Sequence, residues 1–125
     1  MKKYLYIIFT FIFTFNCLGN DFVLYTESGF KNQLNSGNKL ILQFHAAWCP
    51  VCKKQKNSLQ QALKSESYNG IVVIIADYDK EKELKQLYKI PQQSTLLLFQ
   101  NKKEISREIA ITDFNEIKKL AKRFK

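Results

Sequence analysis

The sequence contains little glycine, cysteine and histidine. Only four of its 125 residues are glycine, and neither a GxxxxGK[ST] nor a GxGxxG string occurs, which argues against nucleotide chemistry on a phosphate-binding loop. Three irregularly spaced cysteines are too few for a disulfide scaffold, and a single histidine leaves little for an imidazole-based catalytic or metal cluster. Any chemistry of this protein must therefore depend on cysteine.

The length and composition indicate one folded domain. A chain of 125 residues, 46% hydrophobic and 25% charged, can bury enough apolar surface to fold. The net charge is +9, but the basic residues are scattered and interleaved with glutamates. No basic stretch alternates with aromatic residues as a nucleic-acid platform would. We therefore expect no nucleic-acid partner, and at most a weak attraction to acidic lipids or proteins.

The first nineteen residues have the layout of a secretory signal peptide. Lys2 and Lys3 precede a mostly apolar run over residues 4–15, and small residues follow at Cys17 and Gly19. This pattern predicts a signal peptide over residues 1–19 and a mature domain over residues 20–125. The protein would then be extracytoplasmic, either periplasmic or secreted.

Two alternatives for this segment stay open. Cys17 could be a lipid-attachment cysteine that anchors the protein to a membrane, although Asn16 and Thr14 do not fit the usual lipobox. The segment could also be an uncleaved anchor, but its apolar run is shorter than the roughly 20 residues that span a bilayer.

The hydrophobic pattern over residues 21–125 predicts an α/β fold. Short β-branched or continuous apolar runs alternate with segments of helical periodicity, in the order β-α-β-α-β-α-β-β-α. This order predicts a central mixed sheet flanked by helices. Strands are expected over residues 22–25, 40–45, 71–76, 95–99 and 104–109, and helices over residues 28–35, from Pro50, over residues 80–88 and after Thr112, with Ser28 and Thr112 as N-caps.

A Cys-Pro-Val-Cys motif stands between the second predicted strand and the following helix. Pro50 suits an early helical position, which places Cys49 at the helix N-terminus. The unpaired N–H groups and the macrodipole there favour a thiolate, so Cys49 is the expected nucleophile. Cys52 lies about one turn further on, beyond Val51, and can close a disulfide with Cys49 as the resolving thiol.

Two other interpretations of this motif are weaker. A zinc site would need two more ligands, and only His45 and Cys17 are available. A purely structural disulfide would close a very small loop and contribute little chain entropy.

The chain resembles the thioredoxin family over residues 21–125. The match rests on LILQFHAAWCPVCK at residues 40–53, on the strand at 71–76 with the following Asp-Tyr-Asp, on Leu-Tyr-Lys-Ile at 87–90, and on STLLLF at 94–99. The resemblance implies a thioredoxin-like fold and a thiol-disulfide oxidoreductase. Its catalytic residues would be Cys49 and Cys52, and Trp48 would pack beside them. It implies no cofactor beyond the redox-active disulfide, client proteins bearing thiols or disulfides, a redox partner protein, and a monomer.

Three positions depart from the family pattern. Ser94 stands where the family usually has a cis-proline before the Thr-Leu strand, although a shifted loop could give that role to Pro91. The family's buried acid is replaced by Gln43, which cannot accept a proton. His45 follows two residues later, and it could relay protons to Cys52 or be a strand-end histidine without a catalytic part.

The departure at Ser94 keeps a second function open. By what the family implies, the proline discourages metal capture by the two cysteines. Without it, Cys49 and Cys52, with or without His45, could hold Cu(I) or zinc in a non-enzymatic delivery protein. On this interpretation Ser94→Pro weakens metal binding while sparing the fold.

Overall fold

The computed structural model describes residues 22–125. The segment assigned to a signal peptide, Cys17 included, lies outside these residues, so its processing stays a prediction. Within residues 22–125, no helix is long and apolar enough to cross a membrane.

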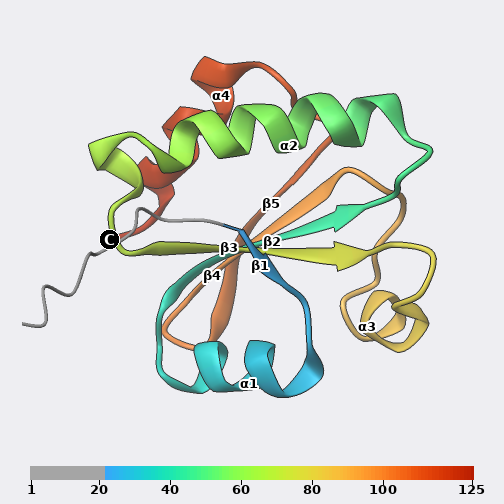
Figure 1. The fold of residues 1–125 in the computed structure, drawn as a ribbon. Coiled ribbons are helices and arrows are strands. Elements are labelled where there is room, and N and C mark those ends of the chain that lie inside the picture. The colour runs from blue at the N-terminus through green and yellow to red at the C-terminus, as the bar shows by residue number, and fades with distance from the viewer. Residues whose placement is uncertain (1–21) are drawn as a thin grey trace, which may run out of the picture.

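A five-stranded mixed sheet forms the centre of the molecule (Figure 1). Its order is β1-β3-β2-β4-β5; β1 and β2 run parallel to β3, whereas β4 runs antiparallel to β2 and to β5. The final two strands, β4 and β5, follow one another as a hairpin, which agrees with the β-α-β-α-β-α-β-β-α order predicted from the sequence. The strands are β1 (Val23–Leu24), β2 (Lys39–His45), β3 (Ile71–Asp77), β4 (Thr95–Gln100) and β5 (Lys103–Ile109).

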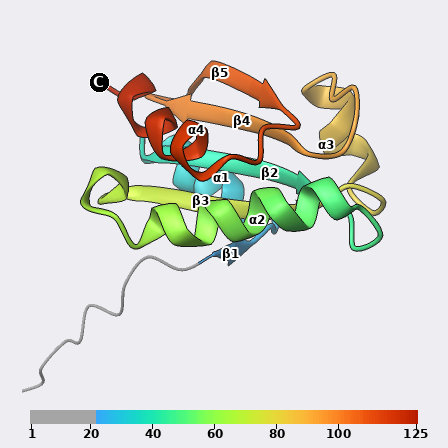
Figure 2. The ribbon, with the colours of Figure 1, turned by 90° about the horizontal axis from the view of Figure 1, so that it is seen from above.

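Helices cover both faces of the sheet, and α2 and α4 lie together over one of them (Figures 1 and 2). On that face Ile41, Val73 and Leu96 of the sheet pack with Leu59 of α2 and Ile117 of α4. The helices are α1 (Glu27–Asn35), α2 (Pro50–Leu63), α3 (Lys82–Leu87) and α4 (Phe114–Lys119), with short 3-10 helices at Glu66–Tyr68 and Leu120–Arg123. The predicted α/β architecture is confirmed.

The opposite face is covered by α1 and α3. Phe30 of α1 and Leu84 of α3 pack there with Leu42, Phe44 and Leu97 of the sheet. The two cores follow from the side-chain alternation along β2, since successive residues point to opposite faces and both faces are apolar. Strand β2 is therefore covered on both sides.

Two expected helix caps are wrong by one or two residues. Thr26, not Ser28, caps α1, and its hydroxyl accepts a hydrogen bond from Gly29 N at 3.1 Å. Asp113, not Thr112, caps α4 and accepts from Glu116 N at 3.0 Å. In both cases the residue with extended backbone and a side chain in reach of the free amides is the cap.

The helical periodicity of the sequence predicts Val51 and Leu87 on buried helix faces, but both are exposed. Leu87 is 72% exposed, because Leu84 and the C-cap residue Tyr88 are the ones that pack against the core there. Val51 is 40% exposed, because the first turn of α2 extends beyond the sheet, and Cys52 and Gln55 are buried instead.

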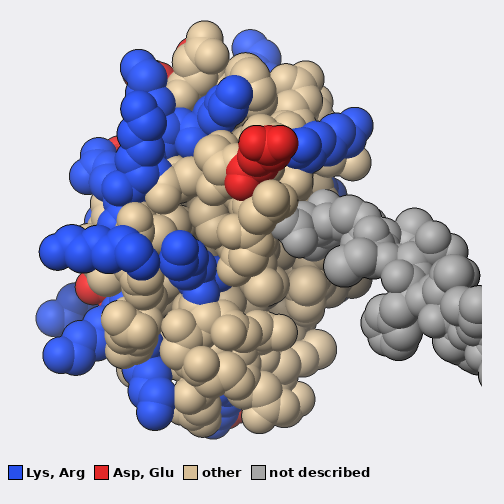
Figure 3. Space-filling view, turned by 90° about the vertical axis from the view of Figure 1, so that its left-hand side faces the viewer, with Lys and Arg blue, Asp and Glu red and all other residues tan. Residues whose placement is uncertain are grey.

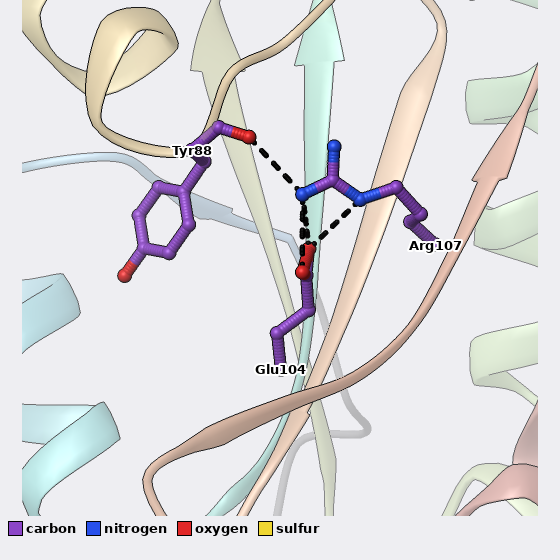
Figure 4. A network of polar contacts seen from close by, with 3 residues as sticks. All are labelled: Tyr88, Glu104 and Arg107. Atoms are coloured by element: carbon purple, nitrogen blue, oxygen red, sulfur yellow. Dashed lines mark hydrogen bonds and ion pairs between the residues drawn. The ribbon is translucent and has the colours of Figure 1, made fainter.

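An arginine on the edge strand fixes the end of α3. The Arg107 guanidinium forms hydrogen bonds with the Glu104 carboxylate at 2.6 to 3.0 Å and donates to the Tyr88 carbonyl oxygen at 3.0 Å (Figure 4). Arg107 and Glu104 belong to β5, and Tyr88 caps α3. This contact ties the edge strand to the start of the loop that leads to Ser94.

Basic side chains gather on part of one face of the molecule. Lysine and arginine side chains outnumber the acidic ones on the face shown in Figure 3, where the C-terminal end of α2 lies. The N-terminal end of α2, with the Cys-Pro-Val-Cys motif, lies at the other end of the helix (Figure 1). Positive charge is not confined to the end in Figure 3, because Lys53, Lys54 and Lys56 lie in the first two turns of α2, directly after Cys52.

Candidate active site

The N-terminus of α2 holds Cys49. Strand β2 ends at His45, and Cys49 takes the N-cap position with extended backbone angles, φ −94° and ψ 111°. Pro50 follows as the first helical residue, where its missing N–H costs nothing. The Cys49 Sγ accepts a hydrogen bond from the Cys52 backbone N–H at 3.1 Å. The sulfur therefore satisfies one of the free amides that begin the helix.

Cys52 lies in the first turn of α2 and is completely buried. It is 0% exposed and Cys49 is 2% exposed, and both are free thiols in this structure. With Ala46 they form a small cluster against Tyr78. In the chain, exposed Trp48 precedes Cys49 and exposed Val51 lies between the two cysteines, so the pair lies next to an apolar surface.

Ser94 lies directly against the two sulfurs. Its Oγ is 3.0 Å from Cys52 Sγ and 3.5 Å from Cys49 Sγ. The residue is 1% exposed and immediately precedes β4, whereas Pro91 is exposed. The structure thus places Ser94, and not Pro91, beside the dithiol.

The backbone of Ser94 is held by the surrounding strands. Its N–H donates to Phe44 O at 2.8 Å, and its carbonyl oxygen accepts from Ala110 N at 3.0 Å. Its φ is +63°, a value that proline cannot adopt, and proline also lacks the N–H. The expectation that Ser94→Pro spares the fold is therefore contradicted by this geometry.

The two cysteines differ in acidity. For Cys49, burial raises the pKa, but hydrogen bonds from Cys52, Ser94 and Gln93 outweigh it, and the net pKa is lowered. For Cys52, burial and the neighbouring Cys49 raise the pKa despite hydrogen bonds from Ser94 and from the Ala46 backbone. At neutral pH Cys49 is the better source of thiolate. Gln93 was missed from the sequence, because no motif distinguishes it from other loop glutamines.

Two buried glutamines connect β2 with α2. Gln43 and Gln55 are each 0% exposed, and Gln43 Nε2 donates to Gln55 Oε1 at 3.0 Å and to Cys52 O at 3.3 Å. Gln55 Nε2 donates to Ser94 O and Ile111 O, both at 3.0 Å. Gln55 therefore links the helix that carries the cysteines to the loop that carries Ser94. Its place three residues after Cys52, on the buried side of α2, was the sequence signal that could have identified it.

His45 ends β2 beside the dithiol. It is partly exposed, and its Nδ1 is buried without a hydrogen-bond partner among the described residues. Burial lowers its pKa, with a further contribution from the positive charge of Lys56, although the Cys52 backbone and Asp77 act in the opposite direction. His45 is therefore mainly neutral at pH 7.

Trp48 is held at the surface. The residue is 60% exposed, and its indole Nε1–H donates to Asp79 Oδ2 at 2.9 Å. Trp48 thus lies over the end of β3 rather than inside the core. Asp79 was present in the family-like segment of the sequence, but its role as the partner of Trp48 required the structure.

His45 is not brought into a metal-ligand group with the two cysteines, whereas metal binding by Cys49 and Cys52 alone stays a prediction. Within residues 22–125, no group of three or more His, Cys, Asp or Glu residues could hold a metal ion. His45 does not complete a ligand set with Cys49 and Cys52.

The fold and the dithiol define a thioredoxin-fold protein with a CxxC pair at a helix N-terminus. The thioredoxin family model matches residues 21–123. The chain therefore belongs to the thioredoxin family.

Relatives and solved structures agree with this assignment. A thioredoxin of Chlamydia trachomatis is 30% identical over 95 residues, which cover 76% of this chain and 90% of that protein. The crystal structure of Trxlp from Edwardsiella tarda superimposes with a TM-score of 0.77 at 28% identity, covering 81% of this chain and 98% of that one.

Longer relatives match through part of their length only. Protein disulfide isomerase-like 1-4 of Arabidopsis thaliana is 28% identical over 79 residues, which cover 63% of this chain but 13% of that protein. The chain spans at most 24% of the three longer curated relatives that carry disulfide-isomerase names.

Proposed function

We propose that this protein is an exported thiol-disulfide oxidoreductase that exchanges disulfides with client proteins through Cys49 and Cys52. The observation that carries this proposal is the Cys49 sulfur at the N-terminus of α2, hydrogen-bonded by Cys52 N at 3.1 Å, with the second thiol one turn away. Membership of the thioredoxin family supports the same reaction class.

In the first half of the exchange, the Cys49 thiolate attacks one sulfur of a client disulfide. The client S–S bond breaks, and its electron pair leaves on the other client sulfur, which takes up a proton. The lowered pKa of Cys49 supplies the thiolate. The product is a mixed disulfide between Cys49 and the client.

In the second half, Cys52 loses its proton and attacks Cys49 Sγ. The bond between Cys49 and the client sulfur breaks, and the client leaves as a thiolate that is then protonated. The Cys49–Cys52 disulfide is the product, and a redox partner protein must return it to the dithiol. Exposed Trp48 and Val51 offer the client an apolar contact surface beside the pair.

Insulin reduction in the presence of dithiothreitol tests the proposed activity. We expect wild type to accelerate precipitation of the insulin B chain, and Cys49→Ser to reduce the rate to that of dithiothreitol alone. Ser67→Ala, on the 3-10 helix near the other end of α2, serves as the control and is expected to match wild type. Equal rates for wild type and Cys49→Ser would contradict the proposal.

The export part of the proposal rests on the sequence of residues 1–19. Mass spectrometry of the protein isolated from its own cells tests it. A mature chain that begins at Asn20 supports secretion, and a diacylglycerol-bearing Cys17 supports a lipid anchor. An intact Met1 on protein found in the cytosol would contradict export.

A further inference from the structure

One hydroxyl group contacts both sulfurs of the dithiol. Ser94 Oγ is 3.0 Å from Cys52 Sγ and 3.5 Å from Cys49 Sγ. A serine hydroxyl carries one proton and two lone pairs. It can therefore donate to one sulfur while it accepts from the thiol of the other.

The exchange reaction changes which sulfur needs a donor. Before a client binds, Cys49 is the thiol that ionises more readily, because its pKa is the lower of the two. In the mixed disulfide Cys49 is neutral, and the charge must form on Cys52 before resolution. A donor that serves both states must reach both sulfurs.

The surroundings of Cys52 make such a donor important. This thiol is completely buried, which disfavours its thiolate. Gln43 lies where thioredoxins place a buried acid, and its amide contacts the Cys52 carbonyl oxygen rather than the sulfur. Gln43 cannot accept a proton. The carbonyl of Phe44, 4.0 Å from Cys52 Sγ, can accept a hydrogen bond but cannot donate one. The Ala46 backbone also lowers the pKa of Cys52. Ser94 Oγ, however, lies within 3.5 Å of both sulfurs.

The position of Ser94 is fixed although its hydroxyl proton can turn. Hydrogen bonds to Phe44 O, from Ala110 N and from Gln55 Nε2 hold its backbone at both the N–H and the carbonyl oxygen. With this backbone and with the residue 1% exposed, the Oγ lies beside both sulfurs. Rotation about the Cβ–Oγ bond alone then redirects the proton from one sulfur to the other.

We propose that Ser94 is a catalytic residue whose hydroxyl donates a hydrogen bond first to the Cys49 thiolate and then, after the mixed disulfide has formed, to the Cys52 thiolate that resolves it. The inference rests on the proposed exchange activity and deepens it. The Cys52 proton leaves to solvent, the Cys52–Cys49 bond forms, and the bond from Cys49 to the client breaks. The client sulfur keeps the electron pair and takes a proton from solvent, so Ser94 is unchanged at the end.

Reaction with 5,5′-dithiobis(2-nitrobenzoate) separates the two steps. The reduced full chain carrying Cys17→Ser has Cys49 and Cys52 as its thiols. Attack by Cys49 releases one thionitrobenzoate at a rate that depends on the reagent concentration. Resolution by Cys52 then releases a second thionitrobenzoate at a rate that is independent of the reagent concentration. The double variant Cys17→Ser/Cys52→Ser must lack the second phase, and this loss assigns the second phase to Cys52.

Ser94→Ala and Ser94→Gly test the hydroxyl in this background. Both lack Oγ and keep the N–H, but glycine tolerates φ +63° more readily than alanine. We expect the second phase to slow by about tenfold in both variants, the loss typical of one hydrogen bond to a charged group. The pH midpoint of that phase should also rise, which loss of packing alone would not cause.

The outcomes are distinguishable. Similar slowing and a raised pH midpoint in both variants support the proposal. A second phase with unchanged rate or unchanged pH midpoint in either variant overturns it, since the hydroxyl would then not be the cause. If the parent protein releases no second thionitrobenzoate, the exchange reaction itself fails, and that result overturns the proposed function rather than the role of Ser94 alone.

Discussion

The chemistry of the site depends on a few atoms around the two sulfurs. Cys49 Sγ meets the Cys52 amide at 3.1 Å, and Ser94 Oγ lies within 3.5 Å of both sulfurs. The two thiols are alike in type and differ in surroundings. Hydrogen bonds dominate at Cys49, and burial dominates at Cys52. One sulfur is thereby prepared for attack, and the other is held back for resolution.

The first prediction concerns the order of thiol reactivity. The pKa of Cys49 is lowered below its ordinary value of 9.0 and that of Cys52 is raised above it. Iodoacetamide at pH 7 should therefore alkylate Cys49 before Cys52, as peptide mapping by mass spectrometry can show. The pH at which Cys49 reaches half of its maximal alkylation rate should lie below 9.0. Preferential labelling of Cys52 would contradict the assigned roles.

A second prediction follows from the backbone of Ser94. Proline at this position loses the hydrogen bond to Phe44 O and cannot adopt φ +63°. We expect Ser94→Pro to lower the free energy of unfolding by about 2 kcal/mol or more. Urea denaturation measures this, with Ser94→Ala as the control that retains the N–H. Equal stability of the proline and alanine variants would show that the loop re-forms around proline as it does in the family.

At the scale of the elements, the sequence predicts the order and type of strands and helices well. Continuous apolar runs identify β2 and β3, and Pro50 after Cys49 marks the start of α2. These features are local, so they are readable without a structure. The helix caps are harder to predict, because Thr26 and Ser28 lie two residues apart, Thr112 and Asp113 are neighbours, and all four residue types can cap a helix.

The long-range contacts between elements could not be predicted. Gln55 contacts the Ser94 and Ile111 carbonyl oxygens from 39 and 56 residues away in the sequence. The pairing of Trp48 with Asp79 likewise spans 31 residues. Such contacts depend on how β2, β3, α2 and the loop before β4 come together, which no local pattern encodes. The family resemblance indicated that Ser94 would face the dithiol, but not that its backbone would have positive φ.

The third prediction tests the glutamine link between α2 and the Ser94 loop. Gln55→Leu leaves the Ile111 carbonyl and part of the Gln43 amide without their buried partners. We expect a loss of about 2 to 4 kcal/mol in the free energy of unfolding. Gln60→Leu, on the exposed side of the same helix, is the matched control and should change stability by less than about 0.5 kcal/mol. Similar effects of the two substitutions would refute the structural role of Gln55.

On the scale of the whole molecule, basic residues lie at both ends of α2. The face in Figure 3, at the C-terminal end of α2, carries several lysine and arginine side chains. Lys53, Lys54 and Lys56 lie in the first two turns of the same helix, directly after Cys52. A client that docks over Trp48 and Val51 therefore meets an apolar surface with positive charge beside it.

The stability of the whole fold should depend on pH through His45. Burial lowers the pKa of His45 below 6.5, so the unfolded chain binds a proton more readily than the folded one. Stability is then retained above about pH 6.5 and falls as the pH drops through the interval between the two pKa values. Between pH 7 and pH 5, the melting temperature should fall further for wild type than for His45→Gln. Equal falls in the two proteins would contradict the lowered pKa of His45.

The central claim is that Cys49 attacks clients and Cys52 resolves the resulting mixed disulfide. The most direct measurement incubates the reduced Cys52→Ser protein with insulin, quenches with acid, and locates the adduct by peptide mapping and mass spectrometry. The account predicts an insulin chain linked to Cys49 and stable over time, while wild type under the same conditions shows free insulin chains and an internal Cys49–Cys52 disulfide. Absence of an adduct, or an adduct confined to Cys17, would contradict the account.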